Sequence, residues 1–183
     1  MIGNFIADSI VGNKFDHYST EIKQGILLHR EIDTFTDAHP IVRKSKRRLH
    51  TRYKHYKGVI IDIFYDHYLA KNWHHFSEIP LEVYVQSFYK LLQDNFDILP
   101  EKTKHLLPYM IEYNWLYNYQ YHEGIQQVLS GMNRRTKGIS QMNLAIEDLQ
   151  NLDAEFEKDF LLFFEELRIF SNQKMKQISQ TQT

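Results

Sequence analysis

Residues 59–70 read VIIDIFYDHYLA, and in a helix their apolar side chains would point in every direction instead of forming one stripe. A helix of this kind is normally buried inside a protein. Asp62 and Asp66 interrupt the apolar run four residues apart, so they project from the same side of the helix. Burying ionised carboxylates without partners is costly, and the pair therefore needs a cation or strong hydrogen-bond donors. For this pair considered alone, structural carboxylates bound by Arg or Lys are the simpler interpretation.

The remaining sequence predicts further helices around this buried one. Its 183 residues contain only seven Gly and four Pro, and no segment shows the sustained alternation of polar and apolar residues found in a half-buried strand. We therefore expect an all-α protein with a single helical domain over residues 1–172 and a disordered polar tail over residues 173–183. Turn and capping signals place helices at about residues 3–11, 20–34, 40–56, 59–73, 80–95, 100–121, 122–135 and 139–172, with Pro108 kinking or interrupting one of them.

Composition excludes several classes of site and partner. Cysteine is absent, so disulfides and thiolate ligands are ruled out, and a bound metal must be held by His, Asp, Glu or water. The 22 basic and 23 acidic residues nearly cancel, so net charge does not indicate a nucleic-acid partner. No apolar run approaches the roughly 20 residues needed to span a bilayer. We expect a soluble, cytoplasmic protein that binds neither nucleic acids nor membranes.

Isolated acidic and histidine side chains recur in other apolar segments. His29 and Asp33 are four residues apart, a spacing at which an imidazole nitrogen and a carboxylate oxygen can bind one divalent ion. Alone, this pair is more simply a surface interaction within one helix. Asp8 lies in the apolar segment FIADSIV at residues 5–11. One shared polar centre explains these three residues and the two aspartates of residues 59–70 more simply than unrelated anomalies do.

Several motifs in matching order resemble the acyl carrier protein phosphodiesterase family. They are GNFIAD at residues 3–8, HREIDTFTD at residues 29–37, residues 62–73 with YDH at residues 65–67, YNWL at residues 113–116 and GMNRR at residues 131–135. The resemblance implies a helical fold similar to that of the HD-type phosphohydrolases, whose His and Asp side chains gather around a divalent ion. It also implies hydrolysis of the phosphodiester that joins 4′-phosphopantetheine to a serine of acyl carrier protein, with manganese as the metal and this carrier as the partner.

The proposed centre and the resemblance together assign roles to individual residues. The expected catalytic residues are Asp8, His29, Asp33 and Asp66. The expected metal ligands are Asp8, His29, Asp33, Asp62, Asp66 and His67, with Asp62 either a ligand or a support for the ligands. Family members usually carry a segment similar to Met-Asn-Leu-Ala-His-Leu before GNFIAD, so a histidine that can matter for catalysis has no counterpart in this sequence.

Cations near these motifs are expected to contact the substrate. Arg30, Arg134 and Arg135 are candidates for the phosphate or the carrier, although exposed helix charges are an equally good interpretation. Arg47 and Arg48 belong to a basic segment of eight cations that we expect to dock the acidic carrier, with a solvated helix face as the alternative. The eight are Arg43, Lys44, Lys46, Arg47, Arg48, Arg52, Lys54 and Lys57. Asp37, four residues beyond Asp33, is a further candidate ligand, but capping of the helix that begins at Pro40 is the favoured interpretation.

Two other functions fit the same residues. An HD-like nucleotide phosphohydrolase would use the same metal centre, although no Gly-rich phosphate loop supports nucleotide binding. A helical protein that binds the carrier without cleaving it would need no metal at all. Turnover of the carrier separates the first alternative from the phosphodiesterase, and metal content separates the second.

Overall fold

The computed structural model describes residues 1–181, and within this range the chain is helical and contains no strand. The all-α prediction is therefore confirmed. The α-helices are α1 (Ile2–Ile6), α2 (Thr20–Ala38), α3 (Pro40–Arg48), α4 (Lys57–Lys71), α5 (Leu81–Asp94), α6 (Glu101–Glu112), α7 (Trp115–Asn118), α8 (His122–Arg135), α9 (Ala145–Asn151) and α10 (Asp153–Thr181). Short 3-10 helices are η1 (Ala7–Ser9), η2 (Thr51–Tyr56), η3 (Trp73–His75), η4 (Phe96–Ile98) and η5 (Met142–Leu144). None of the helices in this range is both long and apolar enough to cross a membrane.

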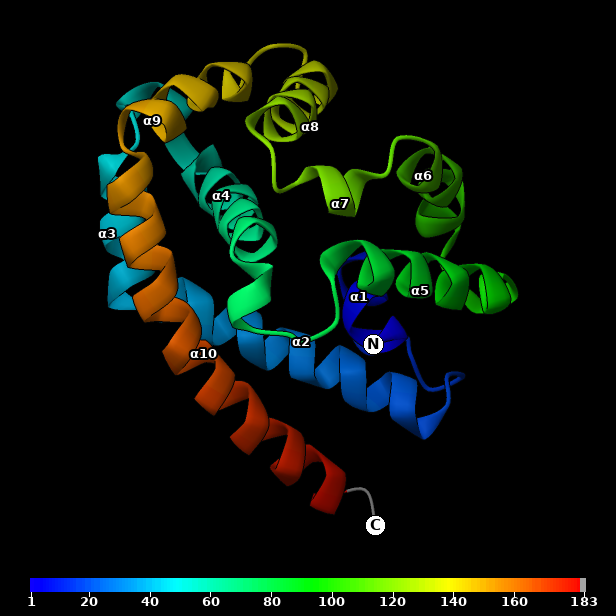
Figure 1. The fold of residues 1–183 in the computed structure, drawn as a ribbon. Coiled ribbons are helices and arrows are strands. Elements are labelled where there is room, and N and C mark those ends of the chain that lie inside the picture. The colour runs from blue at the N-terminus through cyan, green and yellow to red at the C-terminus, as the bar shows by residue number, and fades with distance from the viewer. Residues whose placement is uncertain (182–183) are drawn as a thin grey trace.

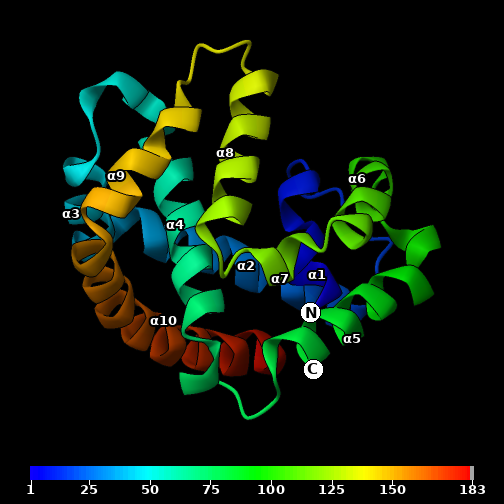
Figure 2. The ribbon, with the colours of Figure 1, turned by 45° about the horizontal axis from the view of Figure 1, so that its top comes forward.

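Helix α4 forms the centre of the larger hydrophobic core. It lies between α10 and α3 on one side and α8 on the other (Figures 1 and 2). Ile60, Ile61 and Phe64 are fully buried, and the Phe64 ring meets the ring of Phe156 in α10 edge to face at a centroid distance of 5.2 Å. Each such side chain contributes roughly 1.5–3 kcal/mol on burial. The prediction that residues 59–70 form a buried helix is thus confirmed.

A close crossing of α1 over α2 fixes the start of the chain. A Cβ atom at Gly3 would collide with the Ile22 carbonyl oxygen, and one at Gly25 would lie 2.9 Å from the Asn4 amide nitrogen. Only glycine lets the two backbones approach this closely. The crossing places η1, and with it Asp8, directly beside α2. A second core, formed mainly by α1, α2, α5 and α6, covers this part of the molecule.

The C-terminal segment differs from the expectation. Residues 139–172 do not form one helix, because η5 and α9 precede α10. In addition, α10 continues to Thr181, so residues 173–181 are helical and the expected disordered tail is wrong for them, whereas residues 182–183 lie outside the described range. Contacts with α2 explain the extension, because Phe170 stacks on Phe35 at 4.3 Å and Lys174 Nζ lies 2.7 Å from Glu31 Oε2.

Two other helix boundaries also differ. Helix α6 continues through Pro108 to Glu112, and the chain turns only at Asn114, which has a left-handed backbone with φ 46°. The basic segment expected as one helix over residues 40–56 divides into α3 and η2 at residues 49–50. Leu49 is buried there, and burial of this apolar residue turns the chain toward the core.

Candidate metal centre

Three of the predicted ligands meet where η1 lies over α2. Asp8 Oδ1 lies 3.0 Å from His29 Nε2, and Asp33 Oδ2 lies 3.1 Å from the same nitrogen. His29 and Asp33 are one turn apart on α2, and the glycine crossing of α1 brings Asp8 to them. One ligand atom from each residue lies within 4.8 Å of the others. The structure therefore brings Asp8, His29 and Asp33 together.

The protonation of this cluster favours a shared cation. The hydrogen bond to Asp8 raises the pKa of His29, and the same bond lowers the pKa of Asp8. Partial burial raises the pKa of Asp33. A ring nitrogen carries at most one proton, so it cannot bond fully to two carboxylates at once. The three atoms are suitable donors for a divalent ion such as manganese or zinc, which would take the place of that proton.

Helix α4 adds two more carboxylates near this cluster. Partial burial raises the pKa of Asp62 to about 6, opposed by the positive charge of Lys46 and reinforced by nearby aspartates that include Asp33. Desolvation, together with the charge of Asp62, raises the pKa of Asp66 to about 7. Both side chains remain open to solvent, so protein atoms crowd them without covering them. Accessible carboxylates with raised pKa values are typical of a concave functional site.

The charge around the centre is strongly negative. Five aspartates influence one another there: Asp8, Asp33, Asp37, Asp62 and Asp66. Among the cations of the described chain, Lys46 binds Asp37 at 3.0 Å and Lys102 lowers the pKa of Asp8 by its charge. Arg30 also acts on His29 by its charge, but these three cations are still fewer than the five carboxylates. Asp8, His29 and Asp33 thus fit the predicted divalent ion in donor type, and Asp62 and Asp66 add negative charge nearby.

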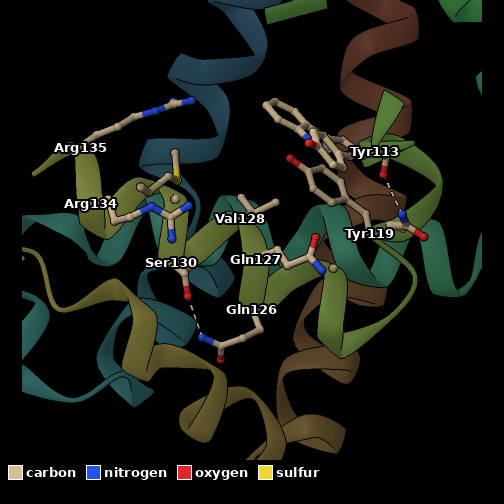
Figure 3. A pocket seen from close by; sticks show the side chains of 13 residues that line it. Tyr113, Tyr119, Gln126, Gln127, Val128, Ser130, Arg134 and Arg135 are labelled. Atoms are coloured by element: carbon tan, nitrogen blue, oxygen red, sulfur yellow. Dashed lines mark hydrogen bonds between the residues drawn. The ribbon is translucent and has the colours of Figure 1, made fainter. Parts of the chain in front are cut away.

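A pocket of about 900 Å³ lies between α7 and α8, and its residue Tyr119 is near Asp66 of α4. Tyr119 lines this pocket. Desolvation raises the pKa of Tyr119, and the charge of Asp66 is near enough to raise it further. Figure 3 shows Tyr113 and Tyr119 on one side of the pocket and the side chains of Arg134 and Arg135 on the other. The predicted cations of the GMNRR motif therefore line a cavity that also presents aromatic rings and the amide of Gln127.

His67 does not join the cluster at His29. Its ring is buried with 1% exposure, its Nδ1 donates a hydrogen bond of 2.7 Å to the Tyr119 carbonyl oxygen, and it groups with His122 and Asp153. Burial lowers the pKa of His67. Successive helix residues point about 100° apart, so Asp66 can face the centre while His67 faces the protein interior. The prediction that both residues ligate one ion is wrong for His67.

The structure separates the predicted substrate-binding cations into two groups. Arg30 donates hydrogen bonds to the Gly12 carbonyl oxygen and to Asn13, so it holds the loop before α2. Arg48 donates to Asp159 at 3.0 Å, so it joins α3 to α10. Both guanidinium groups therefore bind other residues of the protein. In contrast, Arg47 is exposed, and its side chain makes no hydrogen bond, ion pair or cation–π contact within residues 1–181.

Sequence reasoning missed the place of Asp37 and Lys46. The side chain of His39, not that of Asp37, accepts the capping hydrogen bond from the Ile41 amide. Asp37 instead binds Lys46 at the edge of the carboxylate cluster. No local signal distinguishes Lys46 from the other cations of its basic segment. Its position depends on the angle between α2 and α3, which a sequence motif does not encode.

Comparisons with known proteins identify the family of this chain. A model of the acyl carrier protein phosphodiesterase family matches residues 1–167. A protein named acyl carrier protein phosphodiesterase from Photorhabdus laumondii is 29% identical over 165 residues, which cover 90% of this chain and 83% of the relative. Relatives of the same name from Pectobacterium atrosepticum and Enterobacter sp. are 27% and 28% identical, with 100% and 94% of this chain covered and 91% and 90% of theirs.

No solved structure matches this chain, so the similarity to HD-type phosphohydrolases stays a prediction. The family assignment does not depend on it. The match covers the η1, α2 and α4 residues that form the centre and the α8 residues that line the pocket. The chain belongs to the acyl carrier protein phosphodiesterase family.

Proposed function

We propose that this protein hydrolyses the phosphodiester between 4′-phosphopantetheine and a serine of acyl carrier protein, releasing apo-carrier and 4′-phosphopantetheine. The observation that carries the proposal is the meeting of Asp8, His29 and Asp33 beside the raised-pKa carboxylates Asp62 and Asp66, in a chain of this family. A phosphodiester carries negative charge, and a site with an excess of carboxylates would repel it. Substrate binding at this position therefore requires a cation.

We assign that cation as a divalent ion, with manganese as the expected metal. Asp8, His29 and Asp33 would hold it, and Asp62 would complete the set or orient it. When bound, the ion supplies positive charge that stabilises the phosphoryl oxygens and activates water for attack. His29 and Asp33 lie on one long helix, α2, which α1 and α10 cover. The helix therefore holds their donor atoms in fixed positions relative to each other.

Asp66 is suited to the proton transfer. In the metal-free protein, its pKa of about 7 leaves both protonation states populated near neutral pH. Its ionised carboxylate can accept a proton from the attacking water, and the resulting carboxylic acid can donate that proton to the serine Oγ as it leaves. His29 is less suited to this role, because its Nε2 is engaged with two carboxylates.

The neighbouring pocket fits the pantetheine arm. Pantetheine alternates short apolar chains with amide groups, and the pocket offers matching surfaces. Trp115, Val128 and Met132 are its apolar walls, and Asn118, Gln126 and Gln127 supply side-chain amides. We assign Arg134 and Arg135, on the far side of the pocket from Tyr119, to contacts with the phosphate or the carrier (Figure 3).

The proposal is tested by the mass of the carrier. Holo-acyl carrier protein is incubated with the purified chain and Mn²⁺, and intact mass is followed over time. The expected result is loss of the phosphopantetheine mass with Mn²⁺ and no loss after chelation. An unchanged carrier mass in both samples contradicts the proposal. Hydrolysis of nucleotides in place of the carrier would indicate the HD-like nucleotide phosphohydrolase instead.

A further inference from the structure

His67, which does not join the centre at His29, has a buried ring nitrogen without a hydrogen-bond partner. Nδ1 of His67 donates to the Tyr119 carbonyl oxygen, since a carbonyl can only accept. In the neutral ring, Nε2 therefore carries the lone pair. This nitrogen is buried and has no hydrogen-bond partner within residues 1–181. Buried polar atoms almost always have a partner, so His67 Nε2 requires an explanation.

Two other potential ligands lie close to the His67 ring. His122, the first residue of α8, has its ring centroid 5.1 Å from that of His67. Asp153, the first residue of α10, has Oδ1 3.8 Å from His122 Nε2. One ligand atom from each of the three residues lies within 4.8 Å of the others. Tetrahedral zinc bonds of about 2.0–2.2 Å place donor atoms roughly 3.4 Å apart, so the three side chains would move closer together on binding.

We infer that His67, His122 and Asp153 form a second divalent-metal site suited to zinc. Two imidazole nitrogens and one carboxylate oxygen are the donor types that zinc prefers when thiolates are absent. The hydrogen bond from His67 Nδ1 to a backbone carbonyl is the usual support of a metal-binding histidine, because it fixes the ring and directs Nε2 at the ion. This site is separate from the centre at His29 and does not depend on the proposed hydrolysis.

The neighbouring charges permit a cation here. Lys71 Nζ lies 3.3 Å from Asp153 Oδ2, but it also lies 3.1 Å from Glu157 Oε2. Two carboxylates therefore face one ammonium group, and the local charge stays negative. Tyr68 donates a hydrogen bond of 3.0 Å to Asp153 Oδ1, which leaves that oxygen a second lone pair.

The site has a structural role in the fold. Its three ligands come from α4, α8 and α10, which share an apolar core, and α4 also binds the start of α10 through Tyr68 and Lys71. An ion bound by all three fixes the start of α8 and the start of α10 against α4. Since α8 lines the pocket and α4 carries Asp66, zinc binding would hold the two parts of the active site in one geometry.

The test isolates this site from the first one. The full chain without an affinity tag, carrying Asp33→Ala, is stripped with a chelator, and Zn²⁺ binding is measured by calorimetry. We expect one equivalent of Zn²⁺ to bind and to raise the melting temperature. In the Asp33→Ala, His122→Ala double variant, the Zn²⁺ affinity should fall by roughly tenfold or more. His122 is partly exposed at a helix end, so its removal should preserve the circular dichroism spectrum.

A matched control replaces an exposed histidine elsewhere. His105→Ala in the same Asp33→Ala background should bind Zn²⁺ as the background does. Co²⁺ provides a second readout, because its visible absorption reports direct coordination. The spectrum should be present in the His105→Ala protein and lost in the His122→Ala protein. Equal Zn²⁺ affinity in those two proteins, or no Zn²⁺ binding by the Asp33→Ala background, overturns the inference.

Discussion

At the residue scale, the centre depends on two carboxylates that share one imidazole nitrogen. Asp8 and Asp33 approach His29 Nε2 at 3.0 Å and 3.1 Å. Without a cation, only one of them receives the proton, and the other is left facing a nitrogen that it cannot bind. The measured metal affinity therefore reports whether Asp8, His29 and Asp33 bind one ion together.

Replacing Asp33 by Ala should abolish Mn²⁺ binding at this centre and carrier hydrolysis together. The change removes one of the three donors but no core side chain, because Asp33 is 55% exposed. Helicity by circular dichroism should stay unchanged. Mn²⁺ binding can be followed by the electron paramagnetic resonance signal of the free ion. Asp97→Ala, at an exposed aspartate in η4, is the control and should behave as wild type. Hydrolysis that survives the loss of Mn²⁺ would contradict the role of the ion.

Asp66 gives the metal-free protein a characteristic pH dependence. Its pKa of about 7 lies above the ordinary value of 3.8, so the folded protein holds a proton that the unfolded chain releases. Stability should therefore fall as pH rises from about 4 to about 7. Asp66→Asn should raise the melting temperature of chelated protein by a few degrees at pH 8 and much less at pH 5. Asp16→Asn, an exposed site, serves as control. An equal gain at both pH values would contradict this account.

At the element scale, some cations of the basic helix α3 bind α10, and others are exposed to solvent. Asp159 of α10 is 1% exposed and accepts hydrogen bonds from Lys44 at 2.8 Å, Ser45 at 3.1 Å and Arg48 at 3.0 Å. Desolvation alone would raise the pKa of Asp159, but these three partners lower it. Two of the eight predicted docking cations thus hold α3 against α10.

Removal of that carboxylate should be costly. Asp159→Ala leaves a lysine and an arginine without their buried partner, and we expect a loss of roughly 3–5 kcal/mol in the free energy of unfolding. Urea denaturation measures it. Glu155→Ala, one turn earlier on the exposed surface of α10, should change the free energy by less than about 0.5 kcal/mol. A comparable small effect at Asp159 would show that the interaction does not stabilise the fold.

The exposed part of α3 remains the expected docking surface for the carrier. Arg43 and Arg47 are exposed one turn apart, and the neighbouring Lys46 reaches the edge of the centre through Asp37. Reversing both arginines to Glu should raise the KM for holo-carrier by roughly tenfold at low salt, while hydrolysis of a small phosphodiester is spared. Lys158→Glu with Lys176→Glu, two exposed cations of α10, is the matched control. An unchanged KM at low salt would rule out this surface.

The sequence predicted local features of these elements better than their relations in space. Apolar residues on all sides of residues 59–70 correctly predicted a buried helix, and the spacing of His29 and Asp33 correctly predicted a shared face. His67 could not be assigned in this way, since its direction depends on which neighbours α4 contacts. The same holds for Arg48, whose buried partner is 111 residues away along the chain. The disordered tail was wrong because its helix is stabilised by α2, not by its own composition.

At the scale of the whole molecule, the centre lies where two packed regions meet. One region surrounds α4 with α3, α8, α9 and α10, and the other packs α1 and α2 against α5 and α6 (Figure 1). The first contributes Asp62 and Asp66, and the second contributes Asp8, His29 and Asp33. Neither region contains the full set of donors. Metal binding and the relative position of the two regions should therefore be coupled.

Anomalous diffraction from a crystal soaked in Mn²⁺ tests the central claim most directly. The measurement locates the ion and its ligands without depending on activity. We predict a peak bounded by Asp8, His29 and Asp33, with an oxygen of Asp62 or Asp66 from α4 also directed at it. Bound Mn²⁺ without a peak at these residues would contradict the claim that the two regions form one metal centre.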